Sequence, residues 1–80
     1  MSVRLVFLGK LADLAGAPEL QVAGPLGWSG LLAALPQSLA DAAQGDRVKL
    51  ALNGSILADK TALSAKDGDE IALLPPVSGG

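Results

Sequence analysis

The sequence predicts an α+β fold in which a mixed sheet of four to five strands packs on one main helix, with a tail protruding from the C-terminal end. Two apolar segments with strand-like alternation, residues 3–8 and 70–74, predict the sheet, and they lie near the two ends of the chain. If these strands pair in parallel, the chain between them must cross over, and a right-handed crossover that carries a helix is expected. A leucine-rich stripe at helical spacing in the middle of the chain supplies that helix.

The first segment should form a strand near the centre of the sheet. Its two faces consist of Val3, Leu5 and Phe7 and of Arg4, Val6 and Leu8. Because both sets are largely apolar, we expect this strand to be buried on both faces. Residues 10–15 then fit one helical turn with Leu11 and Leu14 facing inward and Gly16 closing it, and residues 19–22 fit a second strand beside the first.

The main helix should begin at residues 27–29, after the break at Gly24-Pro25, with Ser29 as a candidate cap. Its buried stripe consists of Leu31, Leu32 and Leu35. Pro36 ends or kinks this helix because proline lacks the N–H that the next turn needs. Trp28 stands at the helix entrance, where we expect it to pack against the core rather than to stack on a ligand.

A second helical piece is expected over residues 38–44. Ser38 and Asp41 have a capping-box-like spacing at its start, and Gly45 ends it. Residues 48–52 alternate as a strand.

The second half of the chain continues with a hairpin. Asn53-Gly54 is the dipeptide that type I′ turns favour, so residues 55–57 should return as a short edge strand. The connector over residues 58–66 fits one helical turn at residues 61–63. Asp67-Gly68 then predicts a turn directly before the last strand.

The composition argues against several function classes. With no cysteine and no histidine, the chain lacks a thiolate and the commonest acid–base catalyst, so a self-contained enzyme is not expected. A net charge of −2 and a pI near 4.7 argue against a nucleic-acid-binding surface. The apolar runs are too short to span a membrane, and the N-terminus reads as a strand rather than a signal peptide, so we expect a cytoplasmic protein.

Cofactor and metal sites are not expected on this chain. Asp67, Asp69 and Glu70 lack the full ligand set of a calcium loop, so a solvated turn is the preferred interpretation. No glycine-rich phosphate loop is present, which argues against nucleotide binding by this chain alone.

The last six residues are the most informative segment. Pro75 should end the strand before it, and with Pro76 it should direct the chain away from the sheet as a stiff extended segment. Six extended residues reach roughly 20 Å, far enough to enter a partner's cleft. Gly79 and Gly80 carry no Cβ and could pass through a narrow passage, and the only reactive group that they present is the Gly80 carboxylate. The chain thus divides into a domain over residues 1–74 and an extended tail over residues 75–80.

The tail consists of Pro75, Pro76, Val77, Ser78, Gly79 and Gly80. It resembles the tail of the small subunits of molybdopterin synthase, which are MoaD-like sulfur carriers of the ubiquitin-like β-grasp superfamily and end in Pro-Pro-Val-x-Gly-Gly. The resemblance extends to residues 50–54 and 67–70, and more loosely to residues 3–14, so it covers most of the chain. It implies the ubiquitin-like β-grasp fold, which the order of the expected elements also suits.

The resemblance implies sulfur transfer in molybdenum cofactor biosynthesis. An enzyme similar to ubiquitin-activating enzymes would use ATP-Mg to adenylate Gly80, and a sulfur-donor protein would supply the sulfur that turns the adenylate into a thiocarboxylate. The thiocarboxylate would enter the large subunit of molybdopterin synthase and donate its sulfur to cyclic pyranopterin monophosphate, which forms the dithiolene. The resemblance places the catalytic side chains in the large subunit of a heterotetramer.

The resemblance also assigns roles to individual residues. Gly80 is the reacting residue, Gly79 provides clearance, and residues 75–77 set direction and hydrophobic grip. The expected partner-binding residues are Leu73, Leu74, Pro75, Pro76, Val77, Ser78 and Gly79. Where relatives often carry aromatic residues before the two prolines, this chain has Leu73-Leu74. Where relatives commonly carry a basic residue in the turn after the first strand, residues 11–14 of this chain are neutral or acidic. A charge contact with the partner would therefore be missing or would move to Lys10.

Three alternative functions remain open. Two of them use the chemistry of the tail, and in the third the tail is inert. The chain could be a sulfur carrier for thiamin or another thiolated product, or a protein modifier whose Gly80 forms an isopeptide bond with lysine. It could also be a β-grasp interaction module with an inert tail. Only the last predicts that deletion of Gly79-Gly80 leaves function intact.

Overall fold

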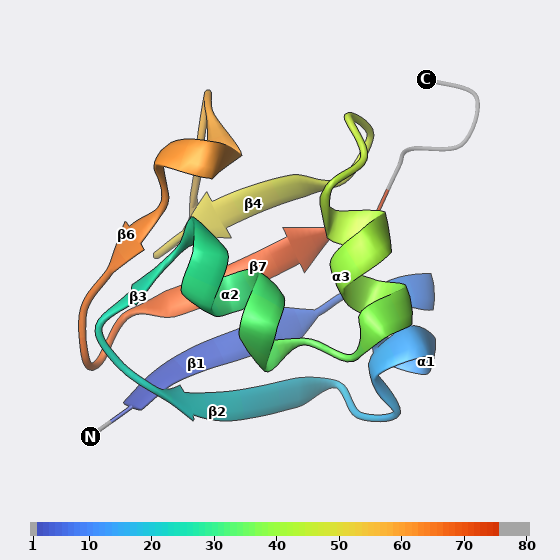
Figure 1. Cartoon of the computed structure of the whole chain (residues 1–80), viewed down its shortest axis with the longest axis horizontal. Coiled ribbons are helices and arrows are strands. Elements are labelled where there is room, and N and C mark those ends of the chain that lie inside the picture. Colours follow the sequence, from blue (N-terminus) through green and yellow to red (C-terminus); the bar gives the residue numbers. More distant parts are fainter. Residues whose placement is uncertain (1, 76–80) are drawn as a thin grey trace.

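The computed structural model describes residues 2–75 (Figure 1). A five-stranded sheet contains β1 (Ser2–Phe7), β2 (Glu19–Ala23), β4 (Lys49–Leu52), β5 (Ser55–Ile56) and β7 (Glu70–Leu74). A two-stranded sheet pairs β3 (Leu26–Gly27) with β6 (Ser64–Ala65). The helical segments are α1 (Lys10–Ala15), α2 (Trp28–Ala34), α3 (Gln37–Ala43) and the 3-10 turn η1 (Lys60–Ala62). Within residues 2–75, none of these helices has the length and apolar character needed to cross a membrane.

The order of strands in the large sheet is β2-β1-β7-β4-β5, which makes β7 the central strand. β1 and β7 run parallel, with Leu5 opposite Ile71, and the remaining neighbours are antiparallel. Helices α2 and α3 lie across one face of the sheet (Figure 1). The expected parallel pairing of the first and last strands is therefore confirmed, and so is the α+β fold with a mixed β-grasp sheet.

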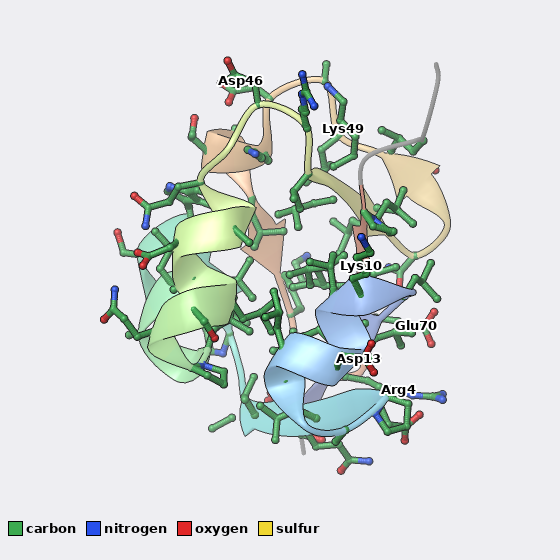
Figure 2. All side chains as sticks on the ribbon, turned by 90° about the vertical axis from the view of Figure 1, so that its right-hand side faces the viewer. Arg4, Lys10, Asp13, Asp46, Lys49 and Glu70 are labelled. Atoms are coloured by element: carbon green, nitrogen blue, oxygen red, sulfur yellow. The ribbon has the colours of Figure 1, made fainter. Side chains whose placement is uncertain are left out.

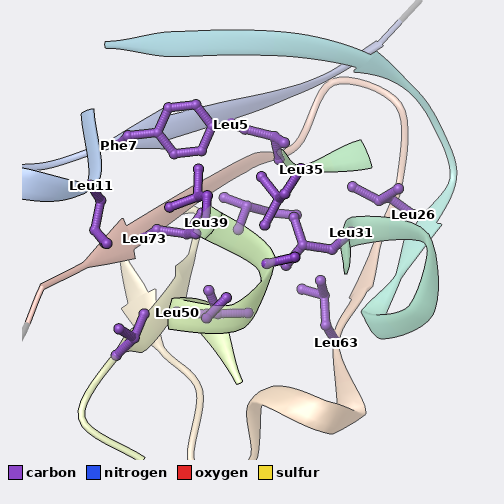
Figure 3. Close-up of a cluster of buried hydrophobic side chains, with 14 of the residues drawn as sticks. Leu5, Phe7, Leu11, Leu26, Leu31, Leu35, Leu39, Leu50, Leu63 and Leu73 are labelled. Atoms are coloured by element: carbon purple, nitrogen blue, oxygen red, sulfur yellow. The ribbon is translucent and has the colours of Figure 1, made fainter. Parts of the chain in front are cut away.

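The core lies between the sheet and the helices, and leucine dominates it (Figure 3). Its largest fully buried side chains are Val3, Leu5, Leu31, Leu39, Leu50, Ile71 and Leu73. Burial of one such side chain contributes about 1.5–3 kcal/mol relative to leaving it exposed. Phe7 is the one aromatic side chain in this buried cluster, so aliphatic side chains make up the rest of the core.

The expectation that β1 is buried on both faces is wrong. Val3, Leu5 and Phe7 are buried, whereas Arg4 is exposed and Val6 is half-buried. The physical reason is that the helices cover one face of the sheet and leave the other open. An apolar residue on the open face has the same sequence signature as one in the core.

The expected break at Pro36 and the expected second helix after it are confirmed, as α2 and α3. Each has seven residues, so neither is the single main helix that was expected. Pro36 precedes α3 as its N-cap residue. Ser29 lies inside α2 and is not its cap, and the expected Ser38–Asp41 capping box does not form. Instead, the Gln37 side-chain amide donates a hydrogen bond to the Asp41 carboxylate at 2.9 Å.

Two other details depart from expectation. Leu14 is 44% exposed rather than inward-facing, because the six-residue α1 buries a single side chain, Leu11. The small β3–β6 sheet was not predicted. Strands of two residues carry no readable alternation, so their pairing follows from the tertiary fold.

The structure confirms the other turns that the sequence predicts. Gly16 has a left-handed backbone with φ of 75° and closes α1. Asn53 and Gly54 both have positive φ, as a type I′ turn requires, and join β4 to the edge strand β5. A helical turn forms in the following connector as η1, one residue ahead of its expected start.

Candidate functional site

The candidate site lies where the central strand β7 reaches its C-terminal end. β7 is flanked by β1 and β4, with Leu73 in register with Phe7 on one side and Leu50 on the other. Leu74 is its last residue, and Pro75 follows outside the strand. Because proline has no N–H, the strand ladder cannot continue through Pro75. The chain therefore leaves the sheet from its central strand, which is paired on both sides.

The structure corrects one residue of the expected docking area. Leu73 is fully buried in the core, with 0% exposure, so its side chain is not available on the surface. Side chains alternate along a strand, and Leu74 and Ala72 point to the opposite, open face. Leu74 and Pro75 are half-buried and remain candidates for contact with a partner. Pro76, Val77, Ser78, Gly79 and Gly80 lie outside the described residues, so their roles stay predictions.

A small apolar row crosses the open face of the sheet. Val6 lies opposite Ala72, Ala72 opposite Ala51, and Ala51 opposite Ile56. Ile56 is 64% exposed at the end of this row. This surface was not predicted, because Val6 was expected to lie in a strand that is covered on both faces. Strand register was the missing information, since register decides which side chains share a face.

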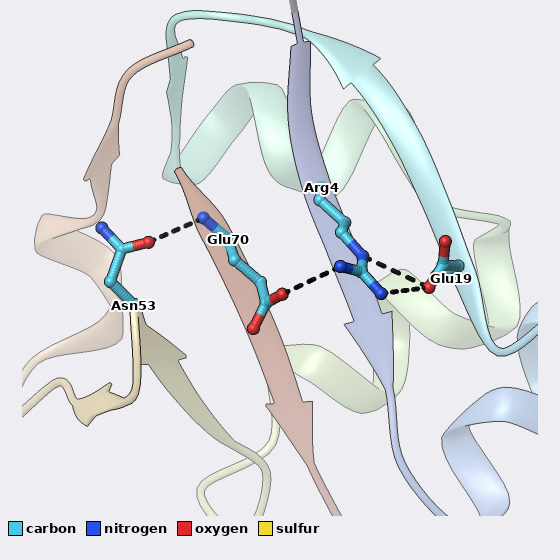
Figure 4. Close-up of polar contacts among 4 residues, drawn as sticks. All are labelled: Arg4, Glu19, Asn53 and Glu70. Atoms are coloured by element: carbon cyan, nitrogen blue, oxygen red, sulfur yellow. Dashed lines mark hydrogen bonds and ion pairs between the residues drawn. The ribbon is translucent and has the colours of Figure 1, made fainter. Parts of the chain in front are cut away.

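Charged residues border this row toward the start of β7. The Arg4 guanidinium donates two hydrogen bonds to Oε2 of Glu19, at 2.6 and 3.2 Å, and lies 3.4 Å from Oε2 of Glu70 (Figure 4). The hydrogen bond to Glu19 and the charge of that carboxylate raise the pKa of Arg4 above its ordinary value. All three side chains are about half-exposed, so the network orders the surface and adds little stability.

Two exposed lysines lie near the end of β7. Lys49 of β4 pairs in register with Leu74, and Lys10 begins α1 shortly after β1. Both lysines are exposed (Figure 2). A partner that receives the tail would meet these two cations beside Pro75. Their contact with a partner stays a prediction.

In the acidic turn before β7, Asp69 makes hydrogen bonds within the fold. The carboxylate of Asp69 accepts hydrogen bonds from the backbone N–H of Lys66 at 2.8 Å and from the Asn53 amide at 3.1 Å. These two donors hold the pKa of Asp69 below its ordinary value, and the Lys66 N–H has the larger effect. Within residues 2–75, no group of three or more acidic side chains is placed to hold a metal ion.

A surface cavity of about 420 Å³ is lined by Trp28 and Lys60 and extends to Lys49 and Leu50 of β4, which pair with the last residues of β7. Trp28 is half-buried and packs against the core, which confirms its expected structural role. The Lys60 ammonium lies 6.0 Å from the centre of the Trp28 ring and donates hydrogen bonds to the carbonyl oxygens of Gly45 and Val48. Partial burial lowers the pKa of Lys60. This lysine joins the loop before β4 to η1.

Comparison with known proteins supports one family over nearly the whole chain. Residues 5–80 match the ThiS family. The chain is 36% identical to the molybdopterin synthase sulfur carrier subunit of Escherichia coli (strain K12), over 98% of this chain and 99% of that protein.

Solved structures agree with this fold. The crystal structure of SAMP1 from Haloferax volcanii has a TM-score of 0.71 and 30% identity, covering 100% of both chains. A chain in the complex of subunits 1 and 2 of the molybdopterin-converting factor from Helicobacter pylori has a TM-score of 0.67 and 28% identity, again covering 100% of both chains. The matched sequence, the shared fold and the central strand that leads into the Pro-Pro-Val-Ser-Gly-Gly tail all point the same way: this chain belongs to the ThiS family.

Proposed function

We propose that this chain is the sulfur-carrier subunit of a molybdopterin synthase. The observation that carries the proposal is the 36% identity to the Escherichia coli sulfur carrier subunit over almost the full length of both proteins. The match to the ThiS family reaches residue 80 and so includes the diglycine tail. The Helicobacter pylori complex, in which subunits 1 and 2 are bound to each other, supports a large subunit as the partner.

The proposed chemistry takes place at the C-terminal carboxylate. A carboxylate is a poor electrophile, so an activating enzyme with ATP-Mg first joins the Gly80 carboxylate to AMP and releases pyrophosphate. A sulfide equivalent from a sulfur-donor protein then attacks the carbonyl carbon and displaces AMP, which leaves a thiocarboxylate. In the large subunit, this sulfur is transferred to cyclic pyranopterin monophosphate, and a second thiocarboxylated chain supplies the second sulfur of the dithiolene. Gly80 returns to a carboxylate when water supplies the oxygen.

The fold supports this use of the tail in a specific way. β7 is hydrogen-bonded to a strand on each side, so the sheet holds Leu74, the last residue before the tail, in place. A group delivered into a partner's active site must be placed accurately, since misplacement by about 1 Å can cost on the order of 100-fold in rate. With no histidine or cysteine in the chain, the acid–base groups for sulfur transfer belong to the large subunit. We place the assembly, a heterotetramer, in the cytoplasm.

A reconstitution experiment tests the proposal. The chain is prepared with a C-terminal thiocarboxylate by intein cleavage in the presence of sulfide, and it is mixed with the large subunit from the same organism and cyclic pyranopterin monophosphate. We expect dithiolene product and return of the chain to the mass of its carboxylate form. A chain without Gly79-Gly80 is the control and should give no product. Failure of the thiocarboxylated chain to transfer sulfur, with an active large subunit, would refute the proposal.

Protein modification is the second candidate function. Its specific support is the structural likeness to SAMP1, a small archaeal modifier protein, at 30% identity. The same activation by adenylation would then end in an isopeptide bond to a lysine of a target protein. Purification of the tagged chain from its own cells separates the two functions, because a modifier yields covalent conjugates whose mass spectra contain Gly80 linked to lysine.

A further inference from the structure

Two junctions of the chain meet at the edge of the sheet where the tail begins. β1 and β7 run parallel, so their carboxyl ends lie at the same edge. The pairing continues one step beyond β1, where the backbone N–H of Leu8 donates a hydrogen bond to the carbonyl of Leu73 at 3.3 Å. The next residue after Leu8 is Gly9, and the residues after Leu73 are Leu74 and Pro75. The β1–α1 junction is therefore the neighbour of the tail's starting point.

Gly9 has a backbone conformation that L side chains rarely adopt. Its φ is 56° and its ψ is −131°, and it precedes α1 as the N-cap residue. Its carbonyl accepts a hydrogen bond from the N–H of Ala12 at 3.1 Å, which fixes it to the first turn of α1. Glycine is thus the residue that can make this bend without steric strain.

Gly9 also leaves room for Pro75. A Cβ atom built on Gly9 would lie 3.3 Å from Cγ of Pro75, which is tighter than ordinary carbon–carbon contact. Either the new methyl group or the proline ring would have to move. The proline ring cannot adapt by rotation about φ, because φ is fixed near −65°, and Leu74 before it is restricted to extended conformations. The part of the displacement that a change of ring pucker does not absorb is therefore passed on to the direction in which the chain leaves the sheet.

The geometry points to Gly9 as a positioning residue for the tail. By presenting no side chain to the Pro75 ring, Gly9 sets the direction in which Gly80 is carried toward the activating enzyme and the large subunit. This inference rests on the proposed function for its consequence. The close approach of Pro75 to the space that a Gly9 side chain would occupy rests on the structure alone.

Another glycine provides a matched control. Gly16 also has positive φ, at 75°, and it closes the same helix, but a Cβ atom built on it would have nothing within 4 Å. Alanine at either position strains the backbone, whereas only alanine at residue 9 approaches Pro75. Loss of function beyond that of Gly16→Ala, compared at equal fractions of folded protein, then reports the contact with the tail.

The experiment measures the rate of thiocarboxylate formation with ATP, sulfide and the purified activating enzyme, followed by intact mass. We expect Gly9→Ala to slow the reaction on the order of tenfold and Gly16→Ala to leave it nearly unchanged, because misplacement of a reacting group is costly. A double-mutant cycle with Pro75→Ala removes the ring that the new methyl group meets. Within the Pro75→Ala background, Gly9→Ala should have little further effect, whereas an independent effect would simply add.

A second measurement needs the wild-type chain alone. The α protons of Gly9 and the γ protons of Pro75 should give a nuclear Overhauser effect in solution. Absence of this signal, or equal rates for Gly9→Ala and Gly16→Ala with an active wild type, would overturn the role of Gly9 and leave the proposed function standing. A wild-type chain that forms no thiocarboxylate with an enzyme active on its own carrier would instead overturn the proposed function, and with it the role of Gly9 in delivery.

Discussion

The side-chain carbonyl of Asn53 accepts a hydrogen bond from the backbone N–H of Glu70 at 2.9 Å (Figure 4). In the other direction, the backbone N–H of Asn53 donates to the carbonyl of Glu70 at 2.8 Å. Asn53 is the turn residue of the β4–β5 hairpin, and Glu70 is the first residue of the strand that leads to the tail. This pair of hydrogen bonds therefore joins the hairpin to the start of β7.

Substitution of Asn53 should separate its two contributions. Asn53→Gly keeps the positive φ and loses the side-chain hydrogen bonds, which we expect to cost roughly 1 kcal/mol of unfolding free energy. Asn53→Ala should lose about 1 kcal/mol more, because alanine is strained at a φ of 50°. Urea unfolding of both variants checks this order. Unfolding midpoints equal to that of the wild type would show that the hairpin does not depend on Asn53.

Acid should weaken the turn before β7 through Asp69. Its pKa is held below the ordinary value of 3.8 in the fold by the Lys66 N–H and the Asn53 amide. The ionised carboxylate therefore stabilises the fold above its unfolded-state pKa, and this contribution disappears as the pH falls through the lower folded-state value. The difference in unfolding free energy between wild type and Asp69→Asn should be largest at neutral pH and should shrink in acid. A difference that does not change with pH would contradict the assignment.

Truncation of a buried leucine and of an exposed one should change the free energy of unfolding by very different amounts. Leu73→Ala removes a side chain with 0% exposure from the core, and we expect a loss of about 2–5 kcal/mol in unfolding free energy. Leu14→Ala removes a side chain that is 44% exposed, so we expect a change within about 0.5 kcal/mol. Thermal unfolding compares the two variants directly. Similar melting temperatures would show that Leu73 belongs to the surface after all.

Lys60 should stabilise the loop before β4. Lys60→Met keeps most of the apolar stem but removes the ammonium that donates to the carbonyls of Gly45 and Val48, and we expect it to cost about 1 kcal/mol. Lys66→Met alters an exposed lysine and should stay within about 0.5 kcal/mol of the wild type. Amide hydrogen exchange at Val48 gives a local readout. Unchanged protection in Lys60→Met would disprove the proposed role.

Much of the fold could be predicted because local signals and tertiary structure agree. Gly16 and Asn53-Gly54 are residue types that suit the positive φ values found at their positions. Pro36 and Pro75 each end an element because proline cannot donate the next hydrogen bond. The parallel pairing of β1 with β7 followed from two apolar segments at opposite ends of the chain.

The details that the sequence left open depend on what covers each face. Val6 and Leu73 are both apolar strand residues, yet Val6 faces the open side and Leu73 the core. The Gly9–Pro75 approach joins residues far apart in the sequence, and no local pattern marks it. The tail motif itself was readable from residue types, because proline and glycine have narrow physical meanings. The place where the tail leaves the sheet needed the strand order.

The intact mass of the chain shows whether Gly80 carries sulfur as a thiocarboxylate. The chain is purified for this measurement from its own cells through an N-terminal tag, together with bound proteins. We predict a fraction of chains whose mass is higher by the replacement of one terminal oxygen atom with sulfur, copurified with a molybdopterin synthase large subunit. In a strain without the activating enzyme, this fraction should be absent. Chains found only as carboxylates or as lysine conjugates, under conditions in which the cells make molybdopterin, would contradict the account.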